Sequence, residues 1–253
     1  MNIPKIIFIV PYRNREVYKD LFIRHMKYIL EEKDKKYYEI IFSHQCDNKT
    51  FNRGAMKNLG FMYVKEKYPH HYKNITLVFN DVDTMPGKKD MFDYETKQGI
   101  IKHFYGFKFA LGGIVSITGY DFERINGYPN FWGWGFEDNV LQKRALKSNL
   151  KIDRSQFNKF NDYDVLQFYH GKSRKLDDRI IYKMESSING LRTIERKNYN
   201  IKNIEYNIIL LNNTNWNIPE KEENIIYETR KNLSRISQPK ISMSNLLRFS
   251  NKK

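Results

Sequence analysis

The chain has 253 residues, and its 44 lysines and arginines against 29 aspartates and glutamates give a formal net charge of +15. Hydrophobic residues make up 40% and aromatic residues 15%, which excludes wholesale disorder and indicates one large globular domain or two small ones. Cys46 is the single cysteine, so an intramolecular disulfide is excluded and a reducing compartment is favoured.

The positive charge favours anionic partners such as nucleic acid, a membrane surface or a phosphorylated small molecule. A lysine-rich solvated surface accounts for the same charge. We expect no nucleic-acid partner, because no compact basic cluster with interleaved aromatic residues stands out. The opening MNIPKIIFIVPYRNRE is too short in its apolar run to cross a bilayer and has no signal-peptide cleavage pattern, so it predicts a buried strand and no transmembrane segment.

The first part of the chain alternates strand and helix patterns. A β-branched and aromatic run over 6–10, bounded by Pro11, predicts a strand buried on both faces. The patterns that follow predict a helix over 16–32, a strand over 38–43, a helix over 54–67 and a strand over 75–79. This alternation predicts an α/β fold in which ligands bind at the carboxyl ends of the strands.

The second part of the chain is less regular, and residues 87–105 have no clear pattern. An apolar run over 109–117 contains Gly112 and Gly113, which let backbone approach a ligand, although a bulge in an ordinary strand has the same signature. Later patterns predict helices over 120–125, 137–150 and 178–189 and strands over 165–170, 191–196 and 204–211. We therefore predict one domain over residues 1–211 and a basic C-terminal extension over residues 212–253.

Polar and basic loops follow three of the predicted strands, at ends that meet at one edge of a parallel sheet. The loops are Pro11-Tyr12-Arg13-Asn14-Arg15, His44-Gln45 with Phe51-Asn52-Arg53, and Asn80-Asp81-Val82-Asp83. Arginines can hold phosphate or ribose oxygens, and an aromatic ring can stack on a base. One such loop is more often a cap with surface arginines, but three at corresponding ends favour a nucleotide pocket.

Asp81 and Asp83 follow an apolar strand, and strand alternation would place both carboxylates on one side with Val82 on the other. Paired carboxylates suit a hard divalent cation that bridges the oxygens of a diphosphate. Because turns are rich in aspartate, the pair alone is a weak signal, and its position after a buried strand carries the hypothesis. A lone histidine in an apolar strand is more often a core residue than a ligand, and His170 is a candidate ligand only because the aspartate pair calls for another one.

Two tryptophans and two glycines alternate in Trp132-Gly133-Trp134-Gly135, shortly before Glu137-Asp138. Glycines let backbone come close to a ligand, a tryptophan offers a flat wall to a sugar ring, and a carboxylate can take a proton from a hydroxyl. A turn that packs two aromatic rings into a core and ends at an acidic helix N-terminus fits the same residues.

Five motifs occur in one order: IIFIVPYRNRE, FNRGAMKNLGF, VFNDVDTMP, GGIVSITGYDFERINGYPNFWGWGFED and FYHGKSRKLDDRI. Together they resemble the beta-1,4-galactosyltransferase family, including the branch that galactosylates xylose, over about residues 5–211. The resemblance implies a nucleotide-diphospho-sugar transferase (GT-A type) fold with a Rossmann-like, mostly parallel sheet and helices on both faces. It also implies an inverting, metal-dependent glycosyltransferase that moves a hexose from a UDP-sugar to a hydroxyl of a glycan acceptor.

The resemblance further implies roles for individual residues. Donor contacts are matched by Pro11, Tyr12, Arg13, Arg15, Phe51, Arg53, Asp81, Val82, Ala110, Gly112 and Gly113. Asp83 and His170 match metal ligands, Asp138 the base on the acceptor side, Glu137 its neighbouring support, and Trp134 the mobile-loop tryptophan. Acceptor contacts fall on Trp134, Gly135, Asp138, Asn139 and Asp177.

Four positions depart from the family pattern. Gln167 lies where a third metal ligand is expected, and its hard carbonyl oxygen leads us to expect Mn²⁺ with Mg²⁺ as an alternative. Ala110 replaces a tyrosine that restricts the family to galactose, so an N-acetylated hexosamine is a second expected donor sugar. Asn139 and Asp177 replace an acidic and an aromatic residue of the acceptor pocket, which leaves the acceptor open.

A competing hypothesis is a catalytically inactive protein of the same fold that binds glycans or polyanions. The joint presence of Asp81, Asp83, Asp138 and His170 favours the enzyme. Because the sequence shows neither a membrane anchor nor the family's disulfides, we expect a soluble cytoplasmic protein of bacterial or large-virus origin, acting in the host cytoplasm if viral. The oligomeric state stays open.

Overall fold

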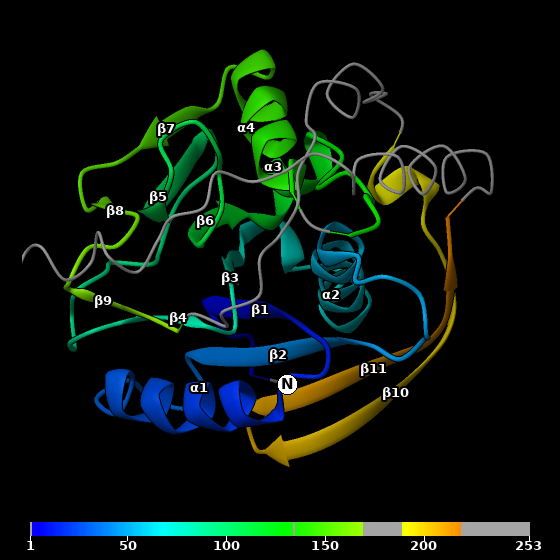
Figure 1. The fold of residues 1–253 in the computed structure, drawn as a ribbon, viewed down its shortest axis with the longest axis horizontal. Helices are drawn as coiled ribbons and strands as arrows, with labels where there is room; N and C mark the ends of the chain where they lie inside the picture. The colour runs from blue at the N-terminus through cyan, green and yellow to red at the C-terminus, as the bar shows by residue number, and fades with distance from the viewer. Residues whose placement is uncertain (1, 134, 169–188, 219–253) are drawn as a thin grey trace, which may run out of the picture.

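A computed structural model describes residues 2–133, 135–168 and 189–218 (Figure 1). Its centre is a nine-stranded sheet with strand order β10-β11-β2-β1-β3-β6-β5-β7, and β8 pairs with β5. The strands are β1 (Ile6–Tyr12), β2 (Tyr38–Gln45), β3 (Thr76–Asn80), β4 (Thr84–Pro86), β5 (Ile100–Gly106), β6 (Ile114–Thr118), β7 (Lys151–Asp153), β8 (Asn158–Lys159), β9 (Val165–Gln167), β10 (Glu195–Glu205) and β11 (Ile208–Asn217). The helices are α1 (Glu16–Ile29), α2 (Arg53–Lys67), α3 (Gly119–Arg124) and α4 (Glu137–Lys147), with short 3₁₀ turns η1 (Tyr72–Asn74) and η2 (Leu191–Thr193).

Helices cover both faces of the central strands, as the sequence predicts. Side chains alternate along β1, so Phe8 packs in one cluster with Phe22 of α1, while Ile9 packs in another with Phe61 of α2. Figure 1 shows α1 and α2 on opposite sides of β1 and β2. All seven residues of β1 are buried, which explains why its sequence is a continuous apolar run rather than an alternating one.

The sheet is mostly parallel but mixed. Parallel pairings join β1 to β2 and β3, β2 to β11, and β5 to β7 and β8. Antiparallel pairings join β6 to β3 and β5, and β10 to β11. The parallel strands β1, β2 and β3 end at one edge of the sheet, and this edge carries the polar loops predicted to hold a ligand.

Two parts of the sheet differ from the sequence prediction. β5 occupies Ile100–Gly106, within a stretch that shows no clear sequence pattern, because His103 is buried and interrupts the apolar run. The strands predicted over 191–196 and 204–211 are misplaced, because residues 191–193 form the 3₁₀ turn η2 and the turn between β10 and β11 falls inside 204–211. Asparagines of β11 are held in the sheet by pairing with β2, and Asn213 Nδ2 donates to Ser43 Oγ at 3.2 Å.

The predicted boundary at residue 211 lies inside β11, which continues to Asn217. The division into a domain and an extension stays a prediction, because residues 219–253 lie outside the described part of the chain. The predicted helix over 178–189, together with Trp134, His170 and Asp177, also falls almost wholly or wholly outside it. Within the described residues, no helix has the length and apolar character needed to span a membrane.

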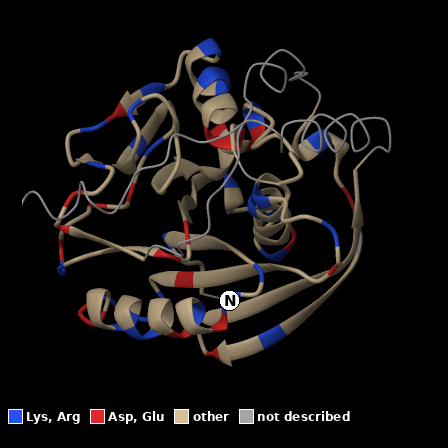
Figure 2. Cartoon of the chain, viewed as in Figure 1, with Lys and Arg blue, Asp and Glu red and all other residues tan. Residues whose placement is uncertain are grey.

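The charges of the described residues are interspersed on the surface. Figure 2 shows Lys and Arg on α1, α2, α4 and β10, with Asp and Glu among them. Several of these charges are paired across the surface, as in Lys65 with Glu123 and Lys102 with Asp93. This arrangement agrees with the explanation of the net charge as a lysine-rich solvated surface.

Candidate active site

The candidate site begins at the N-terminus of α2, which Asn52 fixes in place. The Oδ1 atom of Asn52 accepts a hydrogen bond from the Ala55 N–H at 2.9 Å and caps the helix. Its Nδ2 atom donates to the carbonyl of Asn130 at 3.0 Å, which ties the helix to the segment before the tryptophan loop. A Cβ atom at Gly54 would lie 2.0 Å from the Pro129 carbonyl oxygen, so glycine allows this close approach.

The loop that carries Trp132 and Gly133 lies directly against the N-terminus of α2. The Gly133 N–H donates to the Phe51 carbonyl at 2.9 Å, and Gly133 has a φ of +87°, a conformation that favours glycine. Trp132 is 2% exposed and stacks on Trp216 of β11 with ring centroids 5.3 Å apart. Trp132 therefore belongs to the core, as the structural reading of this motif expects, while Trp134 lies outside the described residues.

Asp138 enters the site from the first turn of α4. Its backbone carbonyl accepts from the Leu111 N–H at 3.0 Å, which joins α4 to the segment before β6. A Cβ atom at Gly112 would lie 2.4 Å from Asp138 Oδ2, so the absence of a side chain there is what admits the carboxylate. The structure thus gives Gly112 a reason to be glycine that differs from the predicted contact with a donor.

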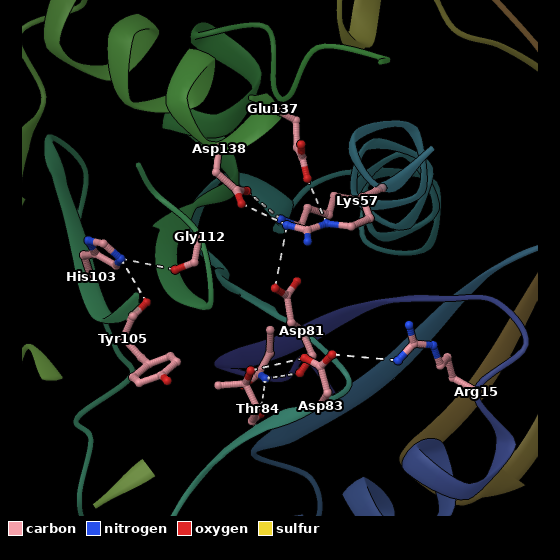
Figure 3. A network of polar contacts seen from close by, with 12 residues as sticks. Arg15, Lys57, Asp81, Asp83, Thr84, His103, Tyr105, Gly112, Glu137 and Asp138 are labelled. Atoms are coloured by element: carbon pink, nitrogen blue, oxygen red, sulfur yellow. Dashed lines mark hydrogen bonds and ion pairs between the residues drawn. The ribbon is translucent and has the colours of Figure 1, made fainter. Parts of the chain in front are cut away.

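A buried cluster of charges joins α2, α4 and the end of β3 (Figure 3). Arg53 Nε lies 2.8 Å from Glu137 Oε1, while Nη2 lies 2.8 Å from Asp138 Oδ2 and 3.6 Å from Asp81 Oδ2. Burial acts to lower the pKa of Arg53, but Asp81, Glu137 and Asp138 outweigh it and raise that pKa well above its usual value. Arg53 is therefore a permanent cation between three carboxylates.

Lys57 is a functional candidate that the sequence analysis missed. It lies one helical turn after Arg53 on the same face of α2, is 1% exposed, and its Nζ atom donates to Asp138 Oδ1 at 3.0 Å. The sequence signal for Lys57 is its position: it lies one helical turn after Arg53 and has apolar neighbours in the helix. Burial raises the pKa of Asp138, but Lys57 and Arg53 together outweigh it and hold that pKa below its usual value.

His103 of β5 supports the same region from behind Gly112. Its Nε2 atom lies 3.0 Å from the Tyr105 carbonyl oxygen and 3.1 Å from the Gly112 carbonyl oxygen, and Arg154 Nε donates to Nδ1 at 3.2 Å. Nε2 therefore carries the proton and Nδ1 the lone pair. Burial, with the neighbouring Arg154, lowers the pKa of His103 to about 4, so the ring is neutral at physiological pH.

Asp83 lies two residues after Asp81, where β4 pairs with β9. The Phe168 N–H donates to the Asp83 carbonyl at 2.8 Å and Thr84 is paired with Gln167, so Asp83 and Gln167 come together. Arg15 Nη1 lies 4.0 Å from Asp83 Oδ2, and the Tyr105 hydroxyl donates to Gln167 Oε1. β3 ends at Asn80, so strand alternation does not apply to Asp81 and Asp83, and Asp81 contacts Arg53 instead.

The donor set at this edge fits a hard divalent cation in part. A carboxylate with 18% of its side chain exposed and an amide oxygen are both ligands that Mn²⁺ and Mg²⁺ accept. No group of three or more His, Cys, Asp or Glu side chains close enough to hold a metal occurs among the described residues. The third predicted ligand, His170, lies outside them.

The remaining predicted residues are placed as follows. Pro11 is paired with Ser43 in the sheet, and Tyr12 donates through its hydroxyl to Glu16 at 3.0 Å. Arg13 donates to the Lys49 carbonyl, which joins the first and second polar loops. The others are buried Val82 and Ala110, half-buried Phe51, Gly113 with φ +72°, Gly135 with φ +109°, and Asn139, which donates to the Phe109 carbonyl at 3.1 Å.

The structure therefore brings Arg53, Asp81, Glu137 and Asp138 into direct contact, from three segments far apart in sequence. Asp83 and Arg15 form a second group at the neighbouring strand ends (Figure 3), and Gln167 lies in β9, which pairs with β4 directly after Asp83. Arg15 at the strand ends supplies a positive charge, and Asp138 beside Gly112 supplies an ionised carboxylate. A nucleotide-sugar transfer site needs both kinds of group.

Comparison with known proteins gives the same class. Residues 2–96 match the family described as the N-terminal region of glycosyl transferase group 7, and residues 101–170 match the N-terminal domain of galactosyltransferase. The catalytic domain of Drosophila beta1,4-galactosyltransferase 7, solved with xylobiose, superposes with a TM-score of 0.71 and 20% identity over 86% of this chain and 95% of that one. The GT-A type fold implied by the sequence resemblance is confirmed.

Two relatives show the family at the level of sequence. Xylosylprotein 4-beta-galactosyltransferase of Caenorhabditis elegans is 30% identical over 183 residues, which are 68% of this chain and 61% of that protein. Beta-1,4-galactosyltransferase 5 of Sus scrofa is 26% identical over 220 residues, 83% of this chain and 55% of that protein. The chain belongs to the beta-1,4-galactosyltransferase family. It spans little more than half the length of these curated relatives.

Proposed function

We propose that this protein transfers galactose from UDP-galactose to a hydroxyl group of a glycan acceptor, with Asp138 as the base. The observation that carries the proposal is the ionised Asp138 carboxylate, which contacts Arg53 and Lys57, packs against Gly112 and shares its contact to Arg53 with Asp81. A second solved structure in the family's fold, a Drosophila beta-1,4-galactosyltransferase 7 mutant, is a complex with manganese, UDP-Gal and xylobiose. Its composition supports the same donor and metal for this chain.

The transfer is an in-line displacement at the anomeric carbon of the donor sugar. Asp138 takes the proton of the acceptor hydroxyl while that oxygen forms the new bond to the anomeric carbon, and the bond from that carbon to the diphosphate oxygen breaks with inversion. UDP leaves with the electron pair of the broken bond. Because the acceptor hydroxyl becomes acidic only as the new bond forms, a carboxylate that is fully ionised beforehand can accept the proton at that moment.

The donor edge must stabilise the negative charge that develops on the departing diphosphate. Asp83, with Gln167 and His170, would hold a divalent cation, Mn²⁺ or Mg²⁺, which supplies this charge neutralisation when bound. Arg15 lies beside Asp83 and adds a fixed positive charge at the same edge. Arg53 fixes Asp81 and Asp138 relative to each other, since one guanidinium group contacts both carboxylates.

A panel assay tests this function. UDP release and sugar transfer are measured with UDP-galactose, UDP-N-acetylgalactosamine, UDP-N-acetylglucosamine and UDP-glucose, each with Mn²⁺ or Mg²⁺ and with xylosides or N-acetylglucosaminides as acceptors. We expect transfer from UDP-galactose, metal dependence and an inverted linkage in the product by NMR. Neither transfer nor donor hydrolysis with any combination, together with tight polyanion binding, would leave the inactive binding protein as the explanation.

A further inference from the structure

Lys57 is a buried cation inside a helix whose surroundings do not otherwise call for one. Its neighbours Met56 and Leu59 are fully buried in an apolar cluster, and the side chain of Lys57 itself is 2% exposed. A buried ammonium group is unfavourable unless it is paired, because it loses its hydration. The ammonium group of Lys57 meets Asp138 Oδ1 at 3.0 Å and lies 4.3 Å from the centroid of the Tyr128 ring.

The two cations of α2 divide the Asp138 carboxylate between them. Lys57 contacts Oδ1, whereas Arg53 contacts Oδ2 at 2.8 Å. Oδ2 is also the oxygen nearest to the position where a Cβ atom of Gly112 would lie, at 2.4 Å. The side chain of Lys57 is 2% exposed and that of Arg53 is 13% exposed, so the contact at Oδ1 is made by the more deeply buried of the two cations.

We propose that Lys57 is a positioning residue for the proposed base: it binds Asp138 through Oδ1 while Arg53 binds Oδ2, so the carboxylate is held in one orientation before the acceptor hydroxyl arrives. This inference rests on the proposed function. Figure 3 shows Lys57 of α2 beside Asp138 of α4, and Arg53 of the same helix contacts the other carboxylate oxygen. A helix that presents both cations four residues apart sets the orientation of the carboxylate before any substrate binds.

The contact between Lys57 and Asp138 leads us to expect a change in the pH dependence of transfer when Lys57 is replaced. Asp138 is faced by Arg53 and Lys57 from α2, by Tyr128 from the preceding loop, by His103 from β5, and by Glu137 and Asp81 through their shared contact with Arg53. Lys57 and Arg53 are the main groups that hold the pKa of Asp138 down, and His103 adds to their effect when its own ring is protonated, near pH 4 and below. Removing Lys57 raises that pKa, and the acid limb of the rate profile moves to higher pH.

The test compares Lys57→Met, which keeps length and loses charge, with Lys57→Gln and Lys57→Arg. We expect Lys57→Met to lower kcat about 10- to 100-fold at neutral pH, with the KM for UDP-galactose unchanged within about twofold because donor contacts are untouched. The midpoint of the acid limb in the pH profile of kcat/KM should move to higher pH by roughly one pH unit. Lys57→Arg should restore the wild-type position of that limb, and Lys65→Met, on the exposed part of the same helix, should change none of these quantities.

A second readout does not depend on turnover. The carboxyl carbon of Asp138 is followed by ¹³C NMR during a pH titration of the unsubstituted protein, Lys57→Met and Lys57→Gln. A rise in the midpoint in both variants supports the inference, and a midpoint that stays in place overturns it. Loss of kcat with an unmoved acid limb would also overturn it, because a purely structural lysine predicts that result. Failure of the proposed function is separate, since the unsubstituted protein would then transfer no sugar.

Discussion

The charged group around Asp138 and the charged group around Asp83 differ in how closely their charges are paired. On the acceptor side, Arg53 and Lys57 contact Asp138 at 2.8 and 3.0 Å, and all three side chains are at most 18% exposed. On the donor side, Arg15 and Asp83 are 4.0 Å apart, with side chains 29% and 18% exposed. The proposed base is therefore held by two close ion pairs, whereas the proposed metal ligand Asp83 has only a long contact with its neighbouring arginine.

Asp138→Asn should have the largest effect on activity among the substitutions in these two charged groups. We expect kcat to fall about 10²- to 10⁴-fold through loss of the base, while UDP binding measured by calorimetry is retained. The variant also leaves Lys57 and Arg53 with less buried counter-charge, which we expect to cost about 3–5 kcal/mol of stability.

The matched control is the double variant Asp138→Asn with Lys57→Met, which removes the uncompensated ammonium group. Its melting temperature should recover towards that of the unsubstituted protein, whereas its activity should not. Comparable turnover by Asp138→Asn would remove Asp138 as the base. Recovery of activity in the double variant would show that the single substitution acted through folding.

Gly112→Ala tests the close packing of the Asp138 carboxylate against the backbone of residue 112. The new Cβ atom would lie 2.4 Å from Asp138 Oδ2, so the carboxylate must turn or retreat, and we expect kcat to fall about 10- to 100-fold. Steady-state kinetics measure the effect. Gly99→Asn serves as the control, because no atom lies within 4 Å of a Cβ there and asparagine tolerates the φ of +86°. Equal activity of both variants would contradict the proposed role of Gly112.

Asp83→Asn sharpens the comparison from the donor side. Its 4.0 Å contact with Arg15 is long and partly exposed, so we expect a stability change within about 1 kcal/mol. The concentration of Mn²⁺ needed for half-maximal activity should rise roughly tenfold or more, since a carboxylate ligand is lost. Metal titrations of activity and thermal melting measure both. A large fall in stability, with metal dependence unchanged, would place Asp83 with the buried cluster instead.

Ala110→Tyr gives the smallest expected effect. Ala110 is 7% exposed, and a larger side chain there should narrow the donor pocket. We expect the ratio of kcat/KM for UDP-galactose over UDP-N-acetylgalactosamine to rise about tenfold. Donor competition assays measure the ratio. An unchanged donor profile would show that residue 110 does not border the donor sugar.

Local patterns were sufficient for part of the fold and not for the rest. β1, β2, β3, α1, α2 and α4 each follow a local apolar period, and their positions were predicted to within a few residues. β5 was not predicted, because the polar residue His103 interrupts its apolar run. His103 can be buried because its ring donates to the carbonyls of Tyr105 and Gly112. The extent of the β10–β11 hairpin depends on pairing with β2, which is distant in sequence.

The site divides in the same way. The motifs were sufficient to propose Arg53, Asp81, Glu137 and Asp138 together, and the structure brings these four into contact. Lys57 was missed, because a lysine in a helical pattern is ordinarily solvent-exposed. Trp132 and Trp134 could not be assigned to core or ligand from spacing alone, and the structure places Trp132 in the core beside Trp216.

The sequence by itself determined the alternating strands and helices from β1 to β3, the polar loops at the ends of these strands and the family to which the chain belongs, because all of these are written in local residue patterns. Tertiary structure alone decided which charges face one another: that α2 presents Arg53 and Lys57 to one carboxylate of α4, and that Gly112 leaves room for it. The physical reason is that burial and ion pairing are properties of a shared environment, and the segments that create this environment are separated by tens of residues along the chain.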